Sequence, residues 1–172
     1  MSELQQKYEK LIADQRELQR QFQEQAQALF KETTTEFFNL NPGINAVKWQ
    51  QMIPYWNDGE TCEFSVHTPA FTNATGEDLT DVEFYGEYEG DNPNVWATSN
   101  INTTLTSGRD YYEEDRKKIL AGPAIDVTSC GLFSSMIQRS EFKPIMENMF
   151  GAHARITITR DGIDVEEYED HD

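Results

Sequence analysis

The stretch QQMIPYWNDGETCEFSV, residues 50–66, predicts a β-hairpin around which the rest of the chain would pack. Asn57, Asp58 and Gly59 form a turn signature, because Asn and Asp tolerate unusual backbone angles and Gly adopts positive φ without strain. A loop of those three residues fixes the register of the two strands. The expected cross-strand pairs are Trp56 with Glu60, Met52 with Phe64, and Gln50 with Val66.

This register gives the first strand apolar side chains on both faces, because side chains alternate across a strand. We therefore expect a strand that is buried within a two-sided arrangement. Pro54 has no N–H to donate, so its nitrogen must point away from the pairing or lie at a bulge. One face would carry Met52, Cys62, Phe64 and Val66, and the other Trp49, Ile53 and Tyr55.

The net charge of −17 over 172 residues is unevenly distributed. Residues 49–172 hold 24 acidic and eight basic side chains, a net charge of −16. A field of that sign repels nucleic acid and anionic membranes and attracts basic proteins or cations. We therefore expect no direct contact with nucleic acid or membrane, and a basic protein as the partner. The alternative is that the acidity only keeps the protein soluble.

Nothing in the sequence indicates a secreted or membrane protein. The first residues, MSELQQKYEK, have no apolar segment of a signal peptide, and no stretch approaches eighteen apolar residues. We expect a cytoplasmic protein in which both cysteines, Cys62 and Cys130, are reduced.

Residues 2–38 predict one long helix with a heptad seam, because no Gly or Pro interrupts them and apolar residues recur alternately at three and four positions. Gln15 and Gln25 interrupt the seam and would fix its register. We expect self-association, with a dimer as the first guess; the alternative is a helix that lies along its own domain. Phe30, Phe37 and Phe38 widen the stripe, which suggests docking onto the globular part. The oligomerisation residues would be Leu4, Tyr8, Leu11, Leu18, Phe22 and Leu29.

The remaining chain mixes strands and helices without the βαβ regularity of a parallel sheet, which predicts an α+β fold with an antiparallel sheet. The long helix, residues 1–40, would form one part and residues 41–172 an acidic domain. Residues 95–106 are compatible with a strand or a loop. We expect a third strand at 79–88, a helix at 111–120 capped by Ser107 or Asp110, a helix in the latter half of 124–138, a helix at 141–150 capped by Ser140, and a hairpin of strands 154–159 and 163–168.

No catalytic or metal-binding motif is present. The sequence has no Walker loop, GxGxxG, GxSxG, HExxH or paired CxxC spacing, so we expect neither an enzyme nor a cofactor. The metal candidates are Cys62 with His67, Cys130 with His153, and the acidic tail at 169–172, and all are more simply explained as ordinary core or surface residues. A hydrolase that depends on a divalent metal is the lesser alternative.

An acidic face interleaved with aromatic residues is the candidate binding surface. Carboxylates pair with guanidinium groups and aromatic rings stack on them, so this composition suits an arginine-rich partner. Ordinary core and edge packing is the alternative for each aromatic residue, namely Tyr85, Tyr88, Trp96, Tyr111 and Tyr112. The acidic candidates are Asp81, Glu83, Glu87, Glu89, Asp91, Glu113, Glu114, Asp115, Asp164, Glu166 and Glu167.

Two segments, YWNDGETCEFSV at 55–66 and FGAHARITITRDGIDVEEYEDHD at 150–172, resemble a family of small acidic proteins encoded by tailed bacteriophages. The resemblance covers about a fifth of the chain, and it brings no catalytic residue with it. It implies a phage origin and action in the cytoplasm of the infected host cell. The expected function is modulation of a host DNA-binding or defence protein, in one form by imitating the charge of nucleic acid. The alternative is an oligomeric accessory of phage particles or replication complexes.

Overall fold

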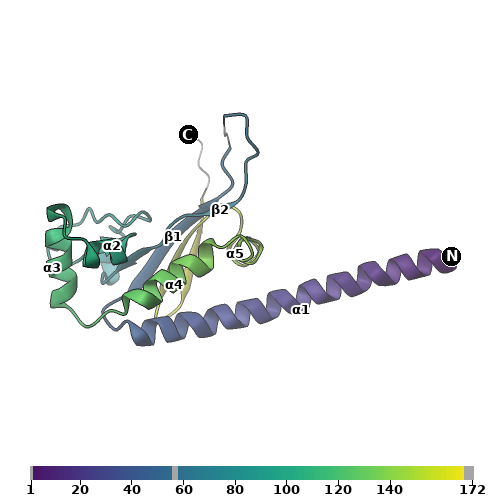
Figure 1. The fold of residues 1–172 in the computed structure, drawn as a ribbon, viewed down its shortest axis with the longest axis horizontal. Coiled ribbons are helices and arrows are strands. Elements are labelled where there is room, and N and C mark those ends of the chain that lie inside the picture. Colours follow the sequence, from purple (N-terminus) through teal and green to yellow (C-terminus); the bar gives the residue numbers. More distant parts are fainter. Residues whose placement is uncertain (1, 56–57, 169–172) are drawn as a thin grey trace. The chain divides into compact units, whose positions relative to one another are not determined.

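The computed structural model describes residues 2–55 and 58–168. A long N-terminal helix precedes an antiparallel sheet and several shorter helices, which confirms the predicted α+β class (Figure 1). The chain divides into two compact units, Met1–Thr34 and Thr35–Asp172, and the division falls inside the first helix. No helix in the described part of the chain combines the length and the apolar character needed to cross a bilayer.

Helix α1 (Glu3–Leu40) ends at a compact polar cap within the second unit. The Asn41 N–H and its side-chain amide both donate to the Phe37 carbonyl, across 3.1 Å and 2.8 Å. The Arg160 guanidinium donates to the carbonyl oxygens of Phe38, Asn41 and Ile44 across 2.7, 3.0 and 3.1 Å. Carbonyls at the end of the helix that have no partner in the next turn are thereby satisfied.

Strand β1 is the centre of a six-stranded antiparallel sheet, and all of its residues except the last are buried. It pairs along one edge with β5 and along the other with both β2 and β3, while β4 and β6 lie at the two ends of the sheet. The prediction of a buried first strand is confirmed for residues 46–51. Ile53 and Tyr55, two of the residues predicted on its second face, lie beyond the end of the strand, and Tyr55 is 67% exposed. The strands are β1 (Ala46–Met52), β2 (Ser65–Val66), β3 (Ala70–Thr72), β4 (Ala97–Thr98), β5 (Ala154–Thr159) and β6 (Ile163–Glu167).

Helices cover one face of this sheet with an aromatic core. Trp49 of β1 is fully buried, and its ring lies 6.4 Å from the ring of Phe133 and 5.8 Å from that of Phe150, on two helices next to β1 (Figure 1). Phe133 also lies 4.9 Å from Phe37, and Phe37 lies 5.8 Å from Phe71. The shorter helices are η1 (Gly76–Leu79), α2 (Ile101–Thr106), η2 (Asp110–Tyr112), α3 (Glu113–Ala121), α4 (Val127–Gln138) and α5 (Lys143–Phe150).

The first hairpin has a shorter ladder and a different register from the prediction. Gln51 pairs with Val66 and Met52 with Ser65, so the predicted pairing of Gln50 with Val66 is wrong by one residue. A slip of one residue moves side chains to the other face, and Val66 consequently lies on the face of Trp49, where it is buried. The ladder stops at Met52, close to Pro54, which has no N–H to contribute.

The turn of this hairpin keeps part of its predicted character. Asp58 and Gly59 have φ values of 25° and 92°, as expected for a tight reversal. Trp56 and Asn57, and with them the predicted pair of Trp56 with Glu60, lie outside the described residues. Cys62 is half-buried and outside any strand, so its assignment to a core strand face is wrong.

The predicted strand at 79–88 is wrong, because the segment folds back on itself. Gly86 has a φ of 84°, and its N–H donates to Glu83 across 3.3 Å, while Glu83 donates to Glu87 across 2.8 Å. These bonds close a tight turn in which Val82 bridges Tyr88. The segment therefore forms a compact loop against Ala74 and Val95 instead of an extended strand.

Helices α3, α4 and α5 lie close to the predicted positions, whereas residues 101–106, predicted as a strand or a loop, form helix α2. Ser107 closes α2, whereas Tyr112 and Phe142 occupy the N-cap positions of α3 and α5, so the predicted caps Ser107, Asp110 and Ser140 are wrong. A 3-10 turn precedes α3, which supplies its entry geometry without a side-chain cap. The predicted hairpin at the end of the chain is confirmed, with Ile156 and Ile158 buried and β6 returning beside β5.

Candidate functional site

A groove of about 610 Å³ lies on the sheet face opposite the aromatic core. Arg155 and Thr157 of β5 reach this face because they alternate with the buried Ile156 and Ile158. Lys48 of β1 lies opposite Thr157 in the ladder and contributes to the same face. The loop around Leu79 to Phe84 forms one wall, and the turn and strand at 161–166 form the other.

Lys48 anchors the loop wall to the sheet. Its ammonium donates to the carbonyl oxygens of Leu79 and Val82 across 3.1 Å and 2.6 Å, and it lies 4.3 Å from the centre of the Phe84 ring. Burial lowers the pKa of this amine, against the opposing attraction of Glu166 and Glu83. The side chain is 4% exposed, so Lys48 holds the wall of the groove in place and is hardly accessible to a ligand.

Arg155 is the second cation of the groove, and two aromatic rings flank it. Its guanidinium carbon lies 4.1 Å from the centre of the Tyr168 ring and 5.4 Å from that of Phe84. Its Nε donates to the Gln50 side-chain oxygen across 3.3 Å. Contacts with ring faces fix the plane of a guanidinium group, so Arg155 is held as part of the sheet surface.

Four carboxylates line the same groove, twice the number of its cations. They come from Glu83 on the loop wall, Asp161 in the turn, and Asp164 and Glu166 on β6. Asp164 and Glu166 lie directly opposite Thr157 and Arg155 in the ladder. None of the four makes a hydrogen bond or ion pair through its carboxylate with any other described residue. Unpaired carboxylates of this kind are available to an external cation.

The structure distributes the eleven predicted acidic residues over several surfaces. Glu83, Asp164 and Glu166 meet in the groove. Glu167 pairs with the buried Ala154 in the ladder, and its side chain projects from the other face of β6. Glu87, Glu89 and Asp91 are exposed on the loop that carries Tyr88, and Asp81 lies near Gly90 in the same loop. Glu113, Glu114 and Asp115 form the first turn of α3.

Several acidic and aromatic candidates have partners of their own. Lys117 forms an ion pair with Glu113 and lowers its pKa through a hydrogen bond. Tyr88 donates to the Asp78 carboxylate across 3.2 Å, and burial raises its pKa. Trp96 is 3% exposed, so its assignment to the surface is wrong: it lies in the core, where its carbonyl accepts from Thr72 across 2.6 Å. Tyr85 and Tyr111 are exposed, as expected.

Sequence reasoning did not select Lys48, Arg155 or Asp161. The signal for Arg155 was present, because the inward Ile156 and Ile158 require their neighbours to point outward. Lys48 meets Leu79 and Val82 only through tertiary folding, over more than thirty positions along the chain, which no local pattern encodes.

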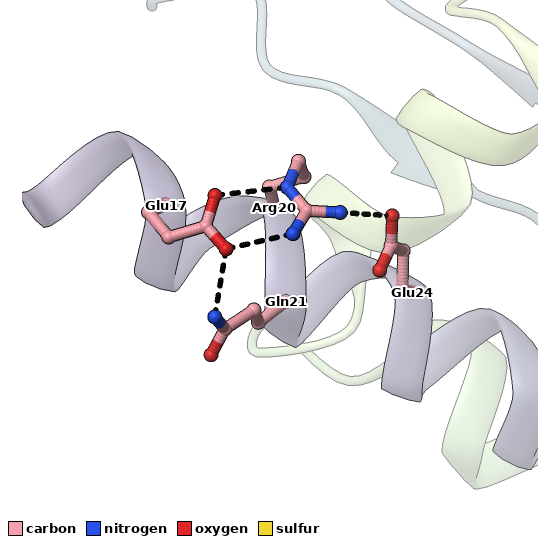
Figure 2. Close-up of polar contacts among 4 residues, drawn as sticks. All are labelled: Glu17, Arg20, Gln21 and Glu24. Carbon is pink, nitrogen blue, oxygen red and sulfur yellow. Dashed lines mark hydrogen bonds and ion pairs between the residues drawn. The ribbon is translucent and has the colours of Figure 1, made fainter. Parts of the chain in front are cut away.

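The heptad seam is a second candidate surface, in the first unit. Its six apolar side chains are 56–79% exposed within the single chain. On the outward heptad positions, Arg20 donates to the carboxylates of Glu17 and Glu24, and Gln21, which lies beside the seam, also donates to Glu17 (Figure 2). The hydrogen bond from Arg20 lowers the pKa of Glu17 to about 2. Polar and apolar faces are thus separated as in a helix that associates with another helix.

The cysteines and histidines considered as metal candidates contact other residues in the structure. Cys130 is buried in the core, where its thiol contacts the Asn41 side-chain oxygen at 3.8 Å and burial raises its pKa to about 12. The His153 ring stacks on Tyr55, and the His67 ring meets Tyr85 edge-on. Among residues 2–55 and 58–168, no three His, Cys, Asp or Glu side chains gather in a way that could hold a metal. The tail at 169–172 lies outside the described residues.

Comparison with known proteins gives no match to any family model, to any curated protein or to any solved structure. The resemblance of the two segments to phage proteins therefore stays a prediction, and function has to be argued from the groove and the helix.

Proposed function

We propose that the protein is a non-enzymatic, acidic binding protein that captures an arginine-rich segment of another protein. The observation that carries this proposal is the groove lined by Glu83, Asp161, Asp164 and Glu166. Within residues 2–55 and 58–168, none of these four carboxylates forms a salt bridge. The surrounding charge of −16 on residues 49–172 favours the approach of a basic partner. Carboxylates placed on two walls suit guanidinium groups, each of which donates its N–H hydrogen bonds in a planar fork to carboxylate oxygens.

The resemblance to phage proteins suggests where this binding takes place and on which kind of partner. A phage protein of this charge would act in the host cytoplasm on a basic host protein, such as a DNA-binding or defence protein. Its acidic surface would occupy the site that normally contacts phosphates. Association driven by such charges is fast and weakens as ionic strength rises.

Capture of partners from bacterial lysate tests this function, with two matched variants beside the wild type. The groove variant carries Asp161→Asn, Asp164→Asn and Glu166→Gln. The loop variant carries Glu87→Gln, Glu89→Gln and Asp91→Asn, which removes the same charge from side chains that do not line the groove. We expect the wild type and the loop variant to retain basic nucleic-acid-binding proteins in a salt-sensitive way, and the groove variant to lose them.

Two other results of this experiment are informative. Equal loss in both variants would assign binding to the overall charge and support imitation of nucleic acid by the whole face. Retention of only neutral or acidic proteins by all three would contradict the proposal.

The second candidate function is an oligomeric scaffold of phage particles or replication complexes. The observation that favours it is the exposed seam from Leu4 to Leu29, which a second copy of the same helix fits by its heptad spacing. It predicts co-purification with phage components that does not respond to the groove variant. Absence from virions and from phage complexes would contradict it.

A further inference from the structure

Strand β6 has one edge that no described strand covers. It is the last strand in the sheet order, and only β5 pairs with it among the described residues. All five of its residues are exposed. An edge of this kind presents N–H and C=O groups to any extended chain that approaches it.

The hydrogen bonds of the hairpin define which groups point outward. Thr159 donates to the Gly162 carbonyl across 2.9 Å, and Tyr168 donates to the His153 carbonyl across 3.0 Å. Bonded and non-bonded pairs alternate along an antiparallel ladder, so Asp164 and Glu166 bond inward to β5. The main-chain N–H and C=O groups of Ile163, Val165 and Glu167 therefore face the open edge.

The charged side chains that β6 turns towards the groove alternate along the strand, as its outward-facing main-chain groups do. Asp164 and Glu166 project into the groove, while Val165 projects to the other face, where it is 44% exposed. Natural edge strands often carry lysine as protection against pairing, but β6 carries three carboxylates and no basic residue. A second copy would place carboxylates against carboxylates, which disfavours pairing of β6 with itself.

We propose that β6 receives an extended segment of the basic partner as an added strand. This inference rests on the proposed function and names the way in which the partner is held. Main-chain hydrogen bonds to Ile163, Val165 and Glu167 supply affinity, and basic side chains at every second position of the segment meet Asp164 and Glu166. The groove thereby selects an alternating basic sequence and not merely a high positive charge.

The probe for this proposal is a synthetic peptide of about seven residues, within the usual length of a strand, with alternating arginine and threonine. Its affinity for the full-length protein is measured by fluorescence anisotropy. Two further peptides are methylated on the backbone nitrogen, one at every threonine and the other at every arginine. In an added antiparallel strand the threonine N–H groups face β6, and in a parallel one the arginine N–H groups do. We therefore expect one methylated peptide to lose binding and the other to retain it.

A protein variant tests the same edge from the other side. Val165→Pro removes one outward N–H and leaves the bonds to β5 intact, since proline is tolerated where the N–H faces away from the ladder. Val165→Ala is the matched control, because it shortens the side chain and keeps the N–H. We expect Val165→Pro to weaken peptide binding by about tenfold or more and Val165→Ala by less than about threefold.

The outcomes separate this inference from the proposed function. Equal binding of both methylated peptides, or equal binding by the two Val165 variants, overturns the added strand; loss of binding in the groove variant would then still support acidic capture. If the wild type binds neither the peptide nor basic proteins, both the added strand and the proposed function are overturned. If circular dichroism shows that Val165→Pro is unfolded, the methylated peptides on the wild type decide alone.

Discussion

The Lys48 ammonium donates a hydrogen bond to the Val82 carbonyl oxygen across 2.6 Å, and so ties the central strand to the loop that walls the groove. Lys48 lies in the middle of β1, and a buried position in a central strand usually holds an apolar residue. Its carbonyl partners belong to a segment that forms no ladder with the sheet. The buried Lys48 amine therefore holds this loop against the sheet in the absence of a ladder, and the loop forms one wall of the groove.

Replacing Lys48 by methionine should destabilise the protein by about 1–3 kcal/mol, because the Leu79 and Val82 carbonyls lose their donor while the buried volume is kept. Urea unfolding at neutral pH measures this loss. Lys118→Met is the control; no hydrogen bond or ion pair of Lys118 is found among the described residues, and we expect a change within about 0.5 kcal/mol. Equal effects of the two changes would contradict the anchoring role.

The same substitution should alter how stability depends on pH. Burial lowers the pKa of Lys48 in the folded state below its unfolded value. Between these two values the unfolded chain binds more protons, so stability rises with pH across that window. Glu83 and Glu166 oppose the shift and Arg155 adds to it. The difference in unfolding free energy between the wild type and Lys48→Met should therefore widen from pH 7 towards pH 10; a difference that narrows would contradict the shift.

Phe133→Ala should lower the free energy of unfolding by about 3–5 kcal/mol. The ring is buried among Phe37, Trp49 and Phe71, so little can fill the cavity that the substitution leaves. Its neighbour Leu132 on the same helix is 67% exposed. Leu132→Ala should change stability by less than about 0.5 kcal/mol. Thermal unfolding of the two variants compares the two faces of α4 directly. Similar melting temperatures would contradict the packing of the Phe133 face of α4 against the sheet.

The two cysteines should differ in reactivity towards iodoacetamide. Cys130 is fully buried and burial raises its pKa to about 12, so very little of it is thiolate at pH 8. Cys62 is partly exposed. Mass spectrometry should find one alkylated cysteine, Cys62, in the native protein and two after unfolding in urea. Rapid native labelling of Cys130 would contradict its burial.

Elements with strong local signals could be predicted from the sequence, and tertiary relationships could not. The C-terminal hairpin follows from the alternation of Ala154–Thr159 and the turn after it. The segment at 79–88 shows the same alternation, yet the chain turns back at Gly86, whose φ is 84°. Gly86 also lies so close to the backbone nitrogen of Ser99 that a side chain would overlap it. Alternation alone does not tell a strand from a closed loop.

The groove itself needed the fold. Glu83 and Asp164 are far apart in the sequence, and each belongs to an acidic run that looks like an ordinary solvated surface. The acidic residues that share the groove are selected by ladder register, which pairs Asp164 with Thr157 and Glu166 with Arg155. A shift of one residue would have turned both carboxylates to the other face. Charge composition could therefore indicate an acidic surface but not its centre.

Self-association is the prediction for the first unit. Leu11 and Leu18 lie one heptad apart in the seam and are 64% and 66% exposed in the single chain. Burial of one leucine contributes about 2 kcal/mol, and several in one seam offset the entropy lost on association. The variant Leu11→Asp with Leu18→Asp should therefore be monomeric by light scattering, whereas the wild type should be an oligomer, with a dimer expected first.

A control with the same substitutions elsewhere isolates the seam from helix propensity. Gln6 and Ala13 are also one heptad apart and exposed, and they share a heptad position with Arg20, since Arg20 lies one further heptad along the helix. Gln6→Asp with Ala13→Asp introduces two aspartates and should leave the oligomer intact. Deletion of residues 1–28 should leave a folded monomer, since the second unit begins after them. A wild type that is monomeric at high micromolar concentration would refute the coiled coil, and an oligomer that survives the deletion would place the interface on the second unit.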